Sequence, residues 1–263
     1  MTRPATLILA GRRASSLDPL AAAAGVTHKS LVPVAGVPMV VRVLRTVAEA
    51  WPDAPIYLSV EDFGVVANEP LIAELYAAGR LTPVEAQHNI VDSVITASRT
   101  TGFPLVITTA DNVLLTADAL NGLVAEGARG EADAIVVMAE KTDIRAAHPD
   151  GQRRFYEFKD GGFSNCNLFW LGSERALKAT DSFREGGQFA KYPARIVKAF
   201  GLVNLIRFRL GIDPIARAFR AISRRFGVRI VPWIVTDGRL AIDVDNERTH
   251  RVAEEILARD AAR

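Results

Sequence analysis

Four charged residues that lie far apart in the sequence have the side-chain types that phosphate chemistry uses. Lys29 stands between a long loop and an apolar run, and Asp111 ends the apolar stretch "PLVITTAD". Asp243 and Asp245 alternate in "AIDVDNE", ahead of the last helical pattern. Carboxylates that converge from distant sequence can hold Mg²⁺ against substrate phosphates, and a lysine ammonium can neutralise a phosphate. The four residues therefore predict a phosphate and Mg²⁺ site, provided that the fold brings them together.

The part of the chain from Gly11 to Lys29 adds a second candidate for phosphate binding. It belongs to a long loop, residues 11 to 37, that is rich in Gly, Pro, Ser and Ala and follows the apolar run "ATLILAG". Exposed backbone amides and basic side chains suit phosphate, so Ala10, Gly11, Arg12 and Arg13 are candidate nucleotide-binding residues. The loop matches neither the dinucleotide-binding glycine pattern nor the Walker A pattern.

Each candidate also has a local structural explanation. Asp245 is well placed to cap the helix that follows it, and Asp111 could tie down a turn. Lys29 alone is most often a solvated charge. It is their joint order along the chain that favours a functional site.

The elements that must position these residues alternate between strand and helix through about residue 140. Short apolar runs predict strands at 5–11, 55–60, 104–111 and 132–140, and helical spacing predicts helices at 38–50, 70–79, 92–100 and 117–127. This alternation is typical of a three-layer α/β fold, a mostly parallel (mixed) sheet with helices on both faces. Ligands of such sheets bind beyond the carboxyl ends of the strands, where the loop and Asp111 fall.

The pattern changes after Arg153. Two β-like runs around Asp160-Gly161-Gly162 predict a hairpin, and further strands are expected at 229–235 and 240–244. An amphipathic helix closes the chain at 246–260. We expect one domain over residues 1–263, with a basic helical insertion at about 181–227.

Composition narrows the class of protein further. The 263 residues carry a net charge of +2, and the single Cys166 excludes an internal disulfide. Four scattered histidines do not suggest a zinc site. The sequence contains no apolar run of about 18 residues and no signal-peptide pattern, so we expect a cytoplasmic protein.

Residues 191–229 form a basic segment, with ten basic residues and one acid, Asp213. Three interpretations remain open: a helical lid or dimer arm with solvated arginines, a binding surface for an acceptor's phosphate, or peripheral contact with an anionic membrane. Nucleic acid is not an expected partner, because aromatic residues are few and the overall charge is near neutral.

The order of these motifs resembles the nucleotidyltransferases of the glycosyltransferase-A-like fold, which include MobA-like and cytidylyltransferase-like NTP transferases. Their LAxGxGxR segment corresponds to "LILAGRRASS", and their K-x-L-x-x-x-x-G-x-P-M/L segment to "KSLVPVAGVPMV". Their later Asp and their DVDTPED-like stretch correspond to "VITTADNVLL" and "AIDVDNERTH", and "GFSNCNLFWL" resembles their acceptor hairpin. The chain departs from the family at Arg13, Ser15 and His28, where the family has Gly, Arg and commonly Pro.

The resemblance implies transfer of a nucleoside monophosphate to a small phosphorylated acceptor, with release of pyrophosphate. The "DSV" at residues 92–94 resembles the cytidylyltransferases and favours CTP, although Asp92 or Ser93 could equally cap a helix. The implied roles are phosphate contact by Lys29, Mg²⁺ binding by Asp111 with Asp243 or Asp245, triphosphate binding by Ala10, Gly11, Arg12 and Arg13, base contact by Ser93, and acceptor binding by Asn165 and Asn167.

Two other functions remain open. The altered residues Arg13 and Ser15 suit a non-catalytic nucleotide-binding or scaffold module on the same fold. A glycosyltransferase of this fold would use a D-x-D motif to hold a sugar nucleotide, but that motif usually follows a mid-chain strand, and Lys29 would then have no clear role.

Overall fold

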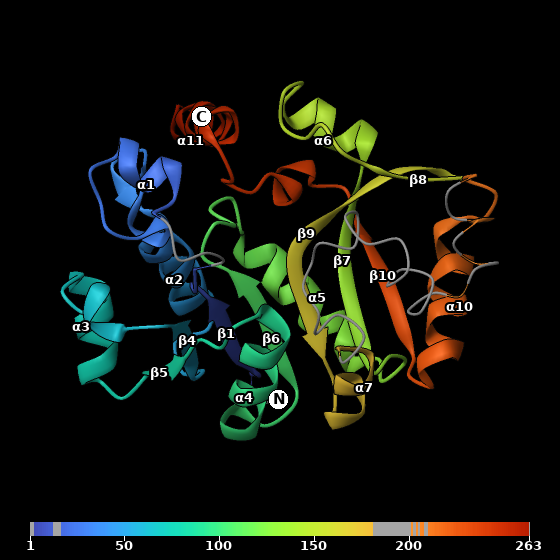
Figure 1. Cartoon of the computed structure of the whole chain (residues 1–263), viewed down its shortest axis with the longest axis horizontal. Coiled ribbons are helices and arrows are strands. Elements are labelled where there is room, and N and C mark those ends of the chain that lie inside the picture. Colours follow the sequence, from blue (N-terminus) through green and yellow to red (C-terminus); the bar gives the residue numbers. More distant parts are fainter. Residues whose placement is uncertain are drawn as a thin grey trace.

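The computed structural model describes residues 3–12, 17–180, 201, 204, 206–207 and 210–262. Its centre is an eight-stranded mixed sheet with the strand order β10-β7-β9-β6-β1-β4-β5, and β8 pairs with β9 (Figure 1). The strands are β1 (Ala5–Leu9), β4 (Ile56–Val60), β5 (Leu81–Glu85), β6 (Leu105–Thr109), β7 (Ala134–Glu140), β8 (Tyr156–Phe158), β9 (Gly161–Leu171) and β10 (Ile230–Val235). The predicted α/β class with a mostly parallel, mixed sheet is confirmed.

Parallel pairing joins β1 to β4 and β6, β4 to β5, and β7 to β10. The long strand β9 runs antiparallel between β6 and β7, and it forms the predicted hairpin with β8. A second sheet of two short strands, β2 (Pro33–Val34) and β3 (Val37–Pro38), closes the loop that follows Lys29. The carboxyl ends of β1, β4 and β6 consequently meet at one edge of the main sheet.

Side chains that alternate along the strands build a core on each face of the sheet. Leu7 belongs to one buried cluster and its neighbour Ile8 to the other, as the two-residue period of a strand requires. Helices α2, α3, α5 and α11 contribute to the cluster of Ile8, while α4 and α10 pack on the cluster of Leu7. Their bounds are α2 (Met39–Ala50), α3 (Pro70–Ala77), α4 (Ile90–Thr101), α5 (Ala117–Ala128), α10 (Ile215–Phe226) and α11 (Glu247–Ala261).

Shorter helices complete the layers. They are α1 (Pro19–Ala23), α6 (Lys141–Ala147) and α7 (Leu177–Thr180), with 3₁₀ turns η1 (Lys29–Leu31), η2 (Phe63–Val65), η3 (Glu174–Ala176) and η6 (Gly238–Ala241). Figure 1 shows α1 and α11 at the upper edge of the sheet, although they come from opposite ends of the chain.

The prediction of a strand at 240–244 is wrong. This apolar run forms η6 and an irregular connection, and Leu240, Ile242 and Val244 are buried because they pack into the same core cluster as Ile8. Edge strand β5 and helix α6 were not predicted, because Pro83 and the short polar pattern of α6 gave weak periodicity.

The predicted insertion at about 181–227 is described only in part. Helix α10 lies within it, while residues 181–200 lie outside the described residues. In the described part of the chain, no helix combines the length and the apolar character that a bilayer span requires. The single-domain boundary stays a prediction.

Candidate functional site

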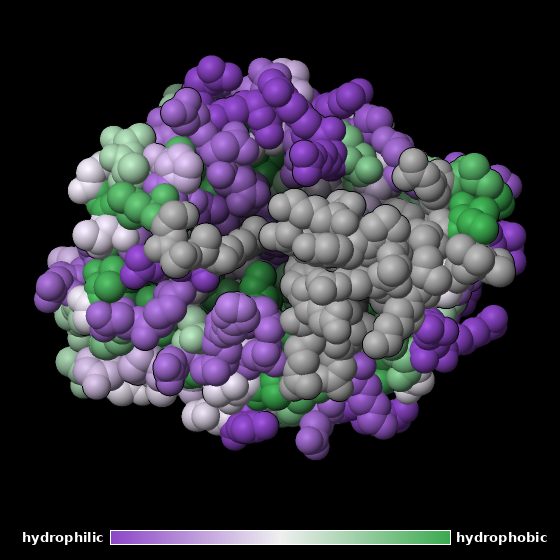
Figure 2. Space-filling model, in the orientation of Figure 1, coloured by the Kyte–Doolittle hydropathy of each residue, from purple (hydrophilic) through white to green (hydrophobic). Residues whose placement is uncertain are grey.

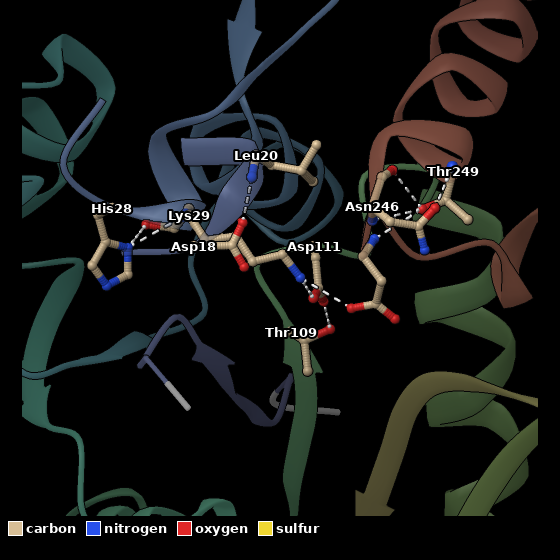
Figure 3. A network of polar contacts seen from close by, with 10 residues as sticks. Asp18, Leu20, His28, Lys29, Thr109, Asp111, Asn246 and Thr249 are labelled. Atoms are coloured by element: carbon tan, nitrogen blue, oxygen red, sulfur yellow. Dashed lines mark hydrogen bonds and ion pairs between the residues drawn. The ribbon is translucent and has the colours of Figure 1, made fainter. Parts of the chain in front are cut away.

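Lys29 forms ion pairs with two carboxylates from distant parts of the chain (Figure 3). Its Nζ donates to Asp111 Oδ2 at 2.8 Å and to Asp245 Oδ1 at 3.0 Å. Lys29 begins the 3₁₀ turn η1, Asp111 follows β6, and Asp245 directly precedes the cap of α11. The fold therefore brings three of the residues predicted from the sequence into direct contact at the carboxyl edge of the sheet.

The side chain of Asp111 is oriented by its own strand. Thr109, the last residue of β6, donates its hydroxyl to Asp111 Oδ1 at 2.6 Å. The backbone carbonyl of Asp111 accepts a hydrogen bond from the amide of Val244 at 3.0 Å. These contacts attach the C-terminal connection to the end of β6 and leave Oδ2 of Asp111 directed at Lys29.

Asp245 is not the helix cap that local reasoning suggested. The N-cap of α11 is Asn246, whose side chain accepts from the amide of Thr249. The Thr249 hydroxyl in turn accepts from the amides of Asp245 and Asn246. Because this capping box satisfies the helix start without the Asp245 carboxylate, that carboxylate can bind Lys29 instead.

Asp243 is the deepest carboxyl group of the site. Burial raises its pKa well above the usual range, and the nearby charges of Asp111 and Asp245 add to the effect. Its Oδ1 is buried without a hydrogen-bond partner among the described residues, whereas a hydrogen bond from Asn167 acts in the opposite direction on its pKa. Asp243 thus lies in the acidic cluster but does not contact Lys29 as closely as the other two carboxylates do.

Lys29 keeps its proton in this setting. Burial alone would lower its pKa, but the charges of Asp111 and Asp245 together outweigh burial, so the pKa is raised. An ammonium is therefore held between two carboxylates at neutral pH, in a position from which it can also meet an anionic ligand.

The loop after β1 is held by a carboxylate that the sequence did not single out. Glu61, at the end of β4, accepts a hydrogen bond from the backbone amide of Arg12 through Oε1. A Cβ at Gly11 would lie 2.9 Å from the Cβ of Ala86 and 3.4 Å from Glu61 Oε1. Gly11 is consequently required by a close approach, and the Arg12 amide is engaged by an internal anion.

His28 connects Glu61 to the lysine segment. Its Nδ1 accepts from the amide of Ser30 at 3.2 Å, so the proton of the neutral ring belongs on Nε2, which lies 3.4 Å from Glu61 Oε2. Burial lowers the pKa of His28, so the neutral form dominates at neutral pH. The residue that departs from the family pattern thus caps η1 and helps to hold Glu61.

The other residues predicted to bind the nucleotide are either occupied by internal contacts or lie outside the described residues. Ala10 is buried, and its amide donates to the carbonyl of Ser59. The Ser93 hydroxyl accepts from the amide of Gln87 at 2.8 Å and donates to the carbonyl of Asn89 at 3.0 Å, so local contacts occupy it. Its contact with a base stays a prediction, and Arg13 and Ser15 lie outside the described residues.

Asn165 and Asn167 lie beside the carboxylates. Asn165 donates its side-chain amide to Asn167 Oδ1 at 3.2 Å, and Asn167 adopts a positive φ of 46° where β9 shifts register against β7. This irregularity directs Asn167 toward Asp243. Their acceptor-binding role stays a prediction.

Thr109 and Glu61 are the site residues that sequence reasoning missed. Thr109 was missed because it lies within an apolar strand pattern. Its spacing of two residues from Asp111 was the available signal, since residues two apart in an extended chain lie on the same side. Glu61 had a signal of the same kind as Asp111, because it is a carboxylate directly after a predicted parallel strand.

The carboxylate oxygens of the site are of the type that binds Mg²⁺, but their arrangement in this structure is not that of a metal site. Carboxylate oxygens are the ligands that Mg²⁺ prefers. Oδ1 of Asp243, which has no hydrogen-bond partner among the described residues, is available as a metal ligand. Within the described residues, however, no three His, Cys, Asp or Glu side chains are arranged to hold a metal ion. The positive charge between Asp111 and Asp245 is the Lys29 ammonium.

A pocket of about 420 Å³ opens beside Asp245. It lies between the start of α1 and the start of α11, and its lining consists of Asp18, Pro19, Leu20, Asp245, Asn246, Glu247 and Arg248. Its size is within the range of small-molecule sites. A ligand in this pocket would share Asp245 with Lys29.

Comparisons with known proteins agree with this architecture. The family model of the MobA-like NTP transferase domain matches residues 6–199, whereas no curated protein matches the chain significantly by sequence. A hypothetical transferase structure from Thermus thermophilus is similar with a TM-score of 0.77 and 22% identity, over 94% of this chain and 99% of that one.

Two further solved structures share the fold. A CMP:2-keto-3-deoxy-manno-octonic acid synthetase complexed with CTP has a TM-score of 0.59 and 11% identity, over 98% of this chain and 99% of that one. The molybdopterin-guanine dinucleotide biosynthesis protein A of Archaeoglobus fulgidus has a TM-score of 0.51 and 12% identity, over 97% and 99% of the two chains. At these identities the likeness concerns the fold.

Proposed function

Because the chain belongs to the MobA-like NTP transferase domain family, we propose that it is a nucleotidyltransferase whose reaction takes place around Lys29. The observation that carries the proposal is the Lys29 ammonium held between Asp111 and Asp245 at the carboxyl edge of the sheet. Two carboxylates that converge on one lysine beside an open pocket are the kind of charge cluster that functional sites concentrate, which supports the proposal.

The proposed reaction transfers a nucleoside monophosphate to an acceptor phosphate. An oxygen of that phosphate attacks the α-phosphorus of the triphosphate, the bond from the α-phosphorus to the bridging oxygen breaks, and pyrophosphate leaves. Negative charge builds up on the non-bridging oxygens and the leaving group, so positioning and charge neutralisation supply most of the catalysis. Lys29 provides a positive charge at the α-phosphate or the acceptor phosphate.

Asp111 and Asp245 are the residues that would hold Mg²⁺, with Asp243 as the third candidate. The ion would supply charge neutralisation on the phosphate oxygens. Thr109 keeps Asp111 oriented for this role, since its hydroxyl binds the Asp111 carboxylate. Contact between Lys29 and a phosphate would release the two carboxylates that the ammonium now bridges.

The donor is proposed to be CTP, and the acceptor a small phosphorylated alcohol or sugar. CTP is favoured by the "DSV" sequence at the start of α4 and by the CTP complex of a synthetase with the same fold. Asn165 and Asn167 are proposed to bind acceptor hydroxyls, because their amides lie on β9 next to the acidic cluster.

Pyrophosphate release is the direct test. The full chain is incubated with Mg²⁺ and each of the four ribonucleoside triphosphates, against a panel of phosphorylated alcohols and sugars. Turnover should be fastest with CTP and should disappear in Lys29→Ala and Asp111→Ala variants that remain folded. Full activity in both variants would sink the assignment.

A non-catalytic nucleotide-binding module is the second candidate. It is favoured by Glu61, because its carboxylate already binds the Arg12 amide in the loop where a triphosphate would lie. Tight triphosphate binding without turnover on any acceptor of the panel would select this function.

A further inference from the structure

The sheet edge formed by β10 and α10 carries an exposed surface that the nucleotidyl-transfer site does not use. One side of α10 packs against the core. Phe219, Ile222 and Phe226 pack against the buried cluster that includes Ile230 of β10, and Ile215 is itself buried. Because these residues recur at helical spacing, they occupy a single side of the helix.

The opposite side of α10 is basic. Arg217, Arg220 and Arg224 follow one another at spacings of three and four residues, so they lie along one face, and all three are exposed. We call this set the arginine face. With the described residues, Arg220 and Arg224 form no ion pair, while Arg217 lies 3.3 Å from Asp213.

A group of exposed apolar side chains adjoins the start of α10. Of the eight large hydrophobic residues that are exposed in the described chain, four belong to this group: Tyr156, Ile206, Leu210 and Ile212. We call these four the apolar tip. Leu210 is 66% exposed and Tyr156 is 52% exposed. Half of the exposed large hydrophobic residues are therefore concentrated at one place, which scattered surface residues would not be.

Backbone contacts hold the parts of the apolar tip together. The amide of Lys159, just after β8, donates to the carbonyl of Asp213 at 3.0 Å. The amide of Ile215 donates to the Asp160 side chain at 3.0 Å. Figure 2 shows hydrophobic surface at the right-hand edge of the molecule, where Figure 1 places β8 and the start of α10, with hydrophilic surface next to it.

The acids near this surface are already engaged. Arg207 binds Asp213 through two hydrogen bonds of 2.7 and 2.5 Å, and Lys141 binds Glu157 at 3.0 Å. Asp160 accepts the Ile215 amide. Asp213 thus offsets part of the charge of Arg217, whereas Arg220 and Arg224 present positive charge that no carboxylate of the described residues pairs with.

We infer that the apolar tip and the arginine face together dock the protein on an anionic lipid bilayer. The aliphatic side chains of the tip would enter the boundary between headgroups and acyl chains, and the arginines would lie against anionic headgroups. Nucleic acid would use the arginines but not Ile206, Leu210 and Ile212. A bilayer uses both kinds of group at once, and it therefore accounts for their position side by side.

Vesicle co-sedimentation of the full chain tests the charge contribution. Binding is compared between phosphatidylcholine vesicles and vesicles with about one third phosphatidylglycerol, at low and high salt. The double variant Arg220→Ala/Arg224→Ala should bind the anionic vesicles about 25-fold more weakly, about five-fold for each arginine. The matched control Arg99→Ala/Arg251→Ala removes the same charge from exposed positions on α4 and α11 and should bind as the unmodified protein does.

The variant Leu210→Ser tests the apolar contribution. Because Leu210 is exposed, the substitution should leave the melting temperature unchanged while weakening vesicle binding about ten-fold at any salt concentration. Equal binding of the Leu210 variant, or equal losses in both double variants, would overturn the inference. Tighter binding to duplex DNA than to anionic vesicles would also overturn it. Nucleotide turnover does not enter these measurements, so their failure would leave the proposed function standing.

Discussion

Replacing Lys29 by Met should destabilise the protein in a way that Mg²⁺ reverses. The substitution keeps most of the side-chain volume but leaves two carboxylates without their shared cation. Breaking a fully buried ion pair costs about 3–5 kcal/mol, whereas an exposed pair contributes less than about 1 kcal/mol. The Lys29 side chain is 22% exposed, that of Asp111 12% and that of Asp245 53%. We therefore expect a loss of about 2 kcal/mol in the free energy of unfolding.

Thermal unfolding with and without Mg²⁺ measures this effect. For a chain of this size, a loss of about 2 kcal/mol corresponds to a melting temperature lower by about 4–8 °C. Mg²⁺ at about one hundred times its dissociation constant should restore up to about 2.7 kcal/mol to the variant, because it binds between the vacated carboxylates. It should stabilise the unmodified protein less, since Lys29 competes for the same place.

Lys178→Met is the matched control. Lys178 is exposed on α7, away from the carboxylates, so its replacement should change neither the stability nor the response to Mg²⁺. The reasoning would be refuted if Lys29→Met unfolded at the same temperature as the unmodified protein and gained nothing from Mg²⁺.

Three other substitutions test separate contacts of the site. Glu61→Gln should tighten CTP and tripolyphosphate binding about five-fold in calorimetry, because it removes a negative charge from the loop at the Arg12 amide. Asp243→Asn should raise the free energy of unfolding at neutral pH in metal-free buffer. The raised pKa of Asp243 makes stability fall as the pH rises above the ordinary carboxyl range, and Asn has no such loss. Thr109→Val should reduce turnover about ten-fold, since Asp111 loses its orienting hydroxyl.

Each of these substitutions has a control and a contradicting outcome. Glu74→Gln removes a similar charge from exposed α3 and should leave ligand binding unchanged, so equal tightening in both variants would argue against a specific role of Glu61. A stability that rises between acid and neutral pH in the unmodified protein, relative to Asp243→Asn, would contradict the sign for Asp243. Thr46→Val removes a hydroxyl from α2 that donates to the carbonyl of Arg42 in its own helix, and should not affect turnover.

The architecture could be predicted from local patterns because most of its elements satisfy them. The apolar runs before Gly11 and Asp111 form β1 and β6, and the helix predicted at 117–127 is α5. The stretch at 240–244 failed because burial alone does not distinguish a strand from a buried irregular connection. Its apolar residues pack into the core cluster of Ile8 without forming a strand.

The sequence predicted the site residues that directly follow parallel strands. It predicted less well the residues whose positions depend on tertiary contacts. The α/β pattern implied that the loop with Lys29 and Asp111 both lie at the carboxyl edge of the sheet. The pairing of β1 with β6, which the pattern did not specify, brings the two residues into contact. The sequence predicted Asp245 as the cap of α11, whereas the side chain of Asn246 caps the helix and leaves the Asp245 carboxylate to bind Lys29. The engagement of the loop by Glu61 depended on side-chain contacts that no local pattern encodes.

The fate of the α-phosphate of CTP tests the central claim most directly. With Mg²⁺ and an acceptor that supports turnover, label at the α-phosphorus should appear in the acceptor product, and label at the γ-phosphorus should leave in pyrophosphate. Transfer of the α-label and release of labelled pyrophosphate should both stop in Lys29→Met, where the ammonium between Asp111 and Asp245 is missing. Transfer of the γ-label to the acceptor, or undiminished α-label transfer by Lys29→Met, would contradict nucleotidyl transfer at this site.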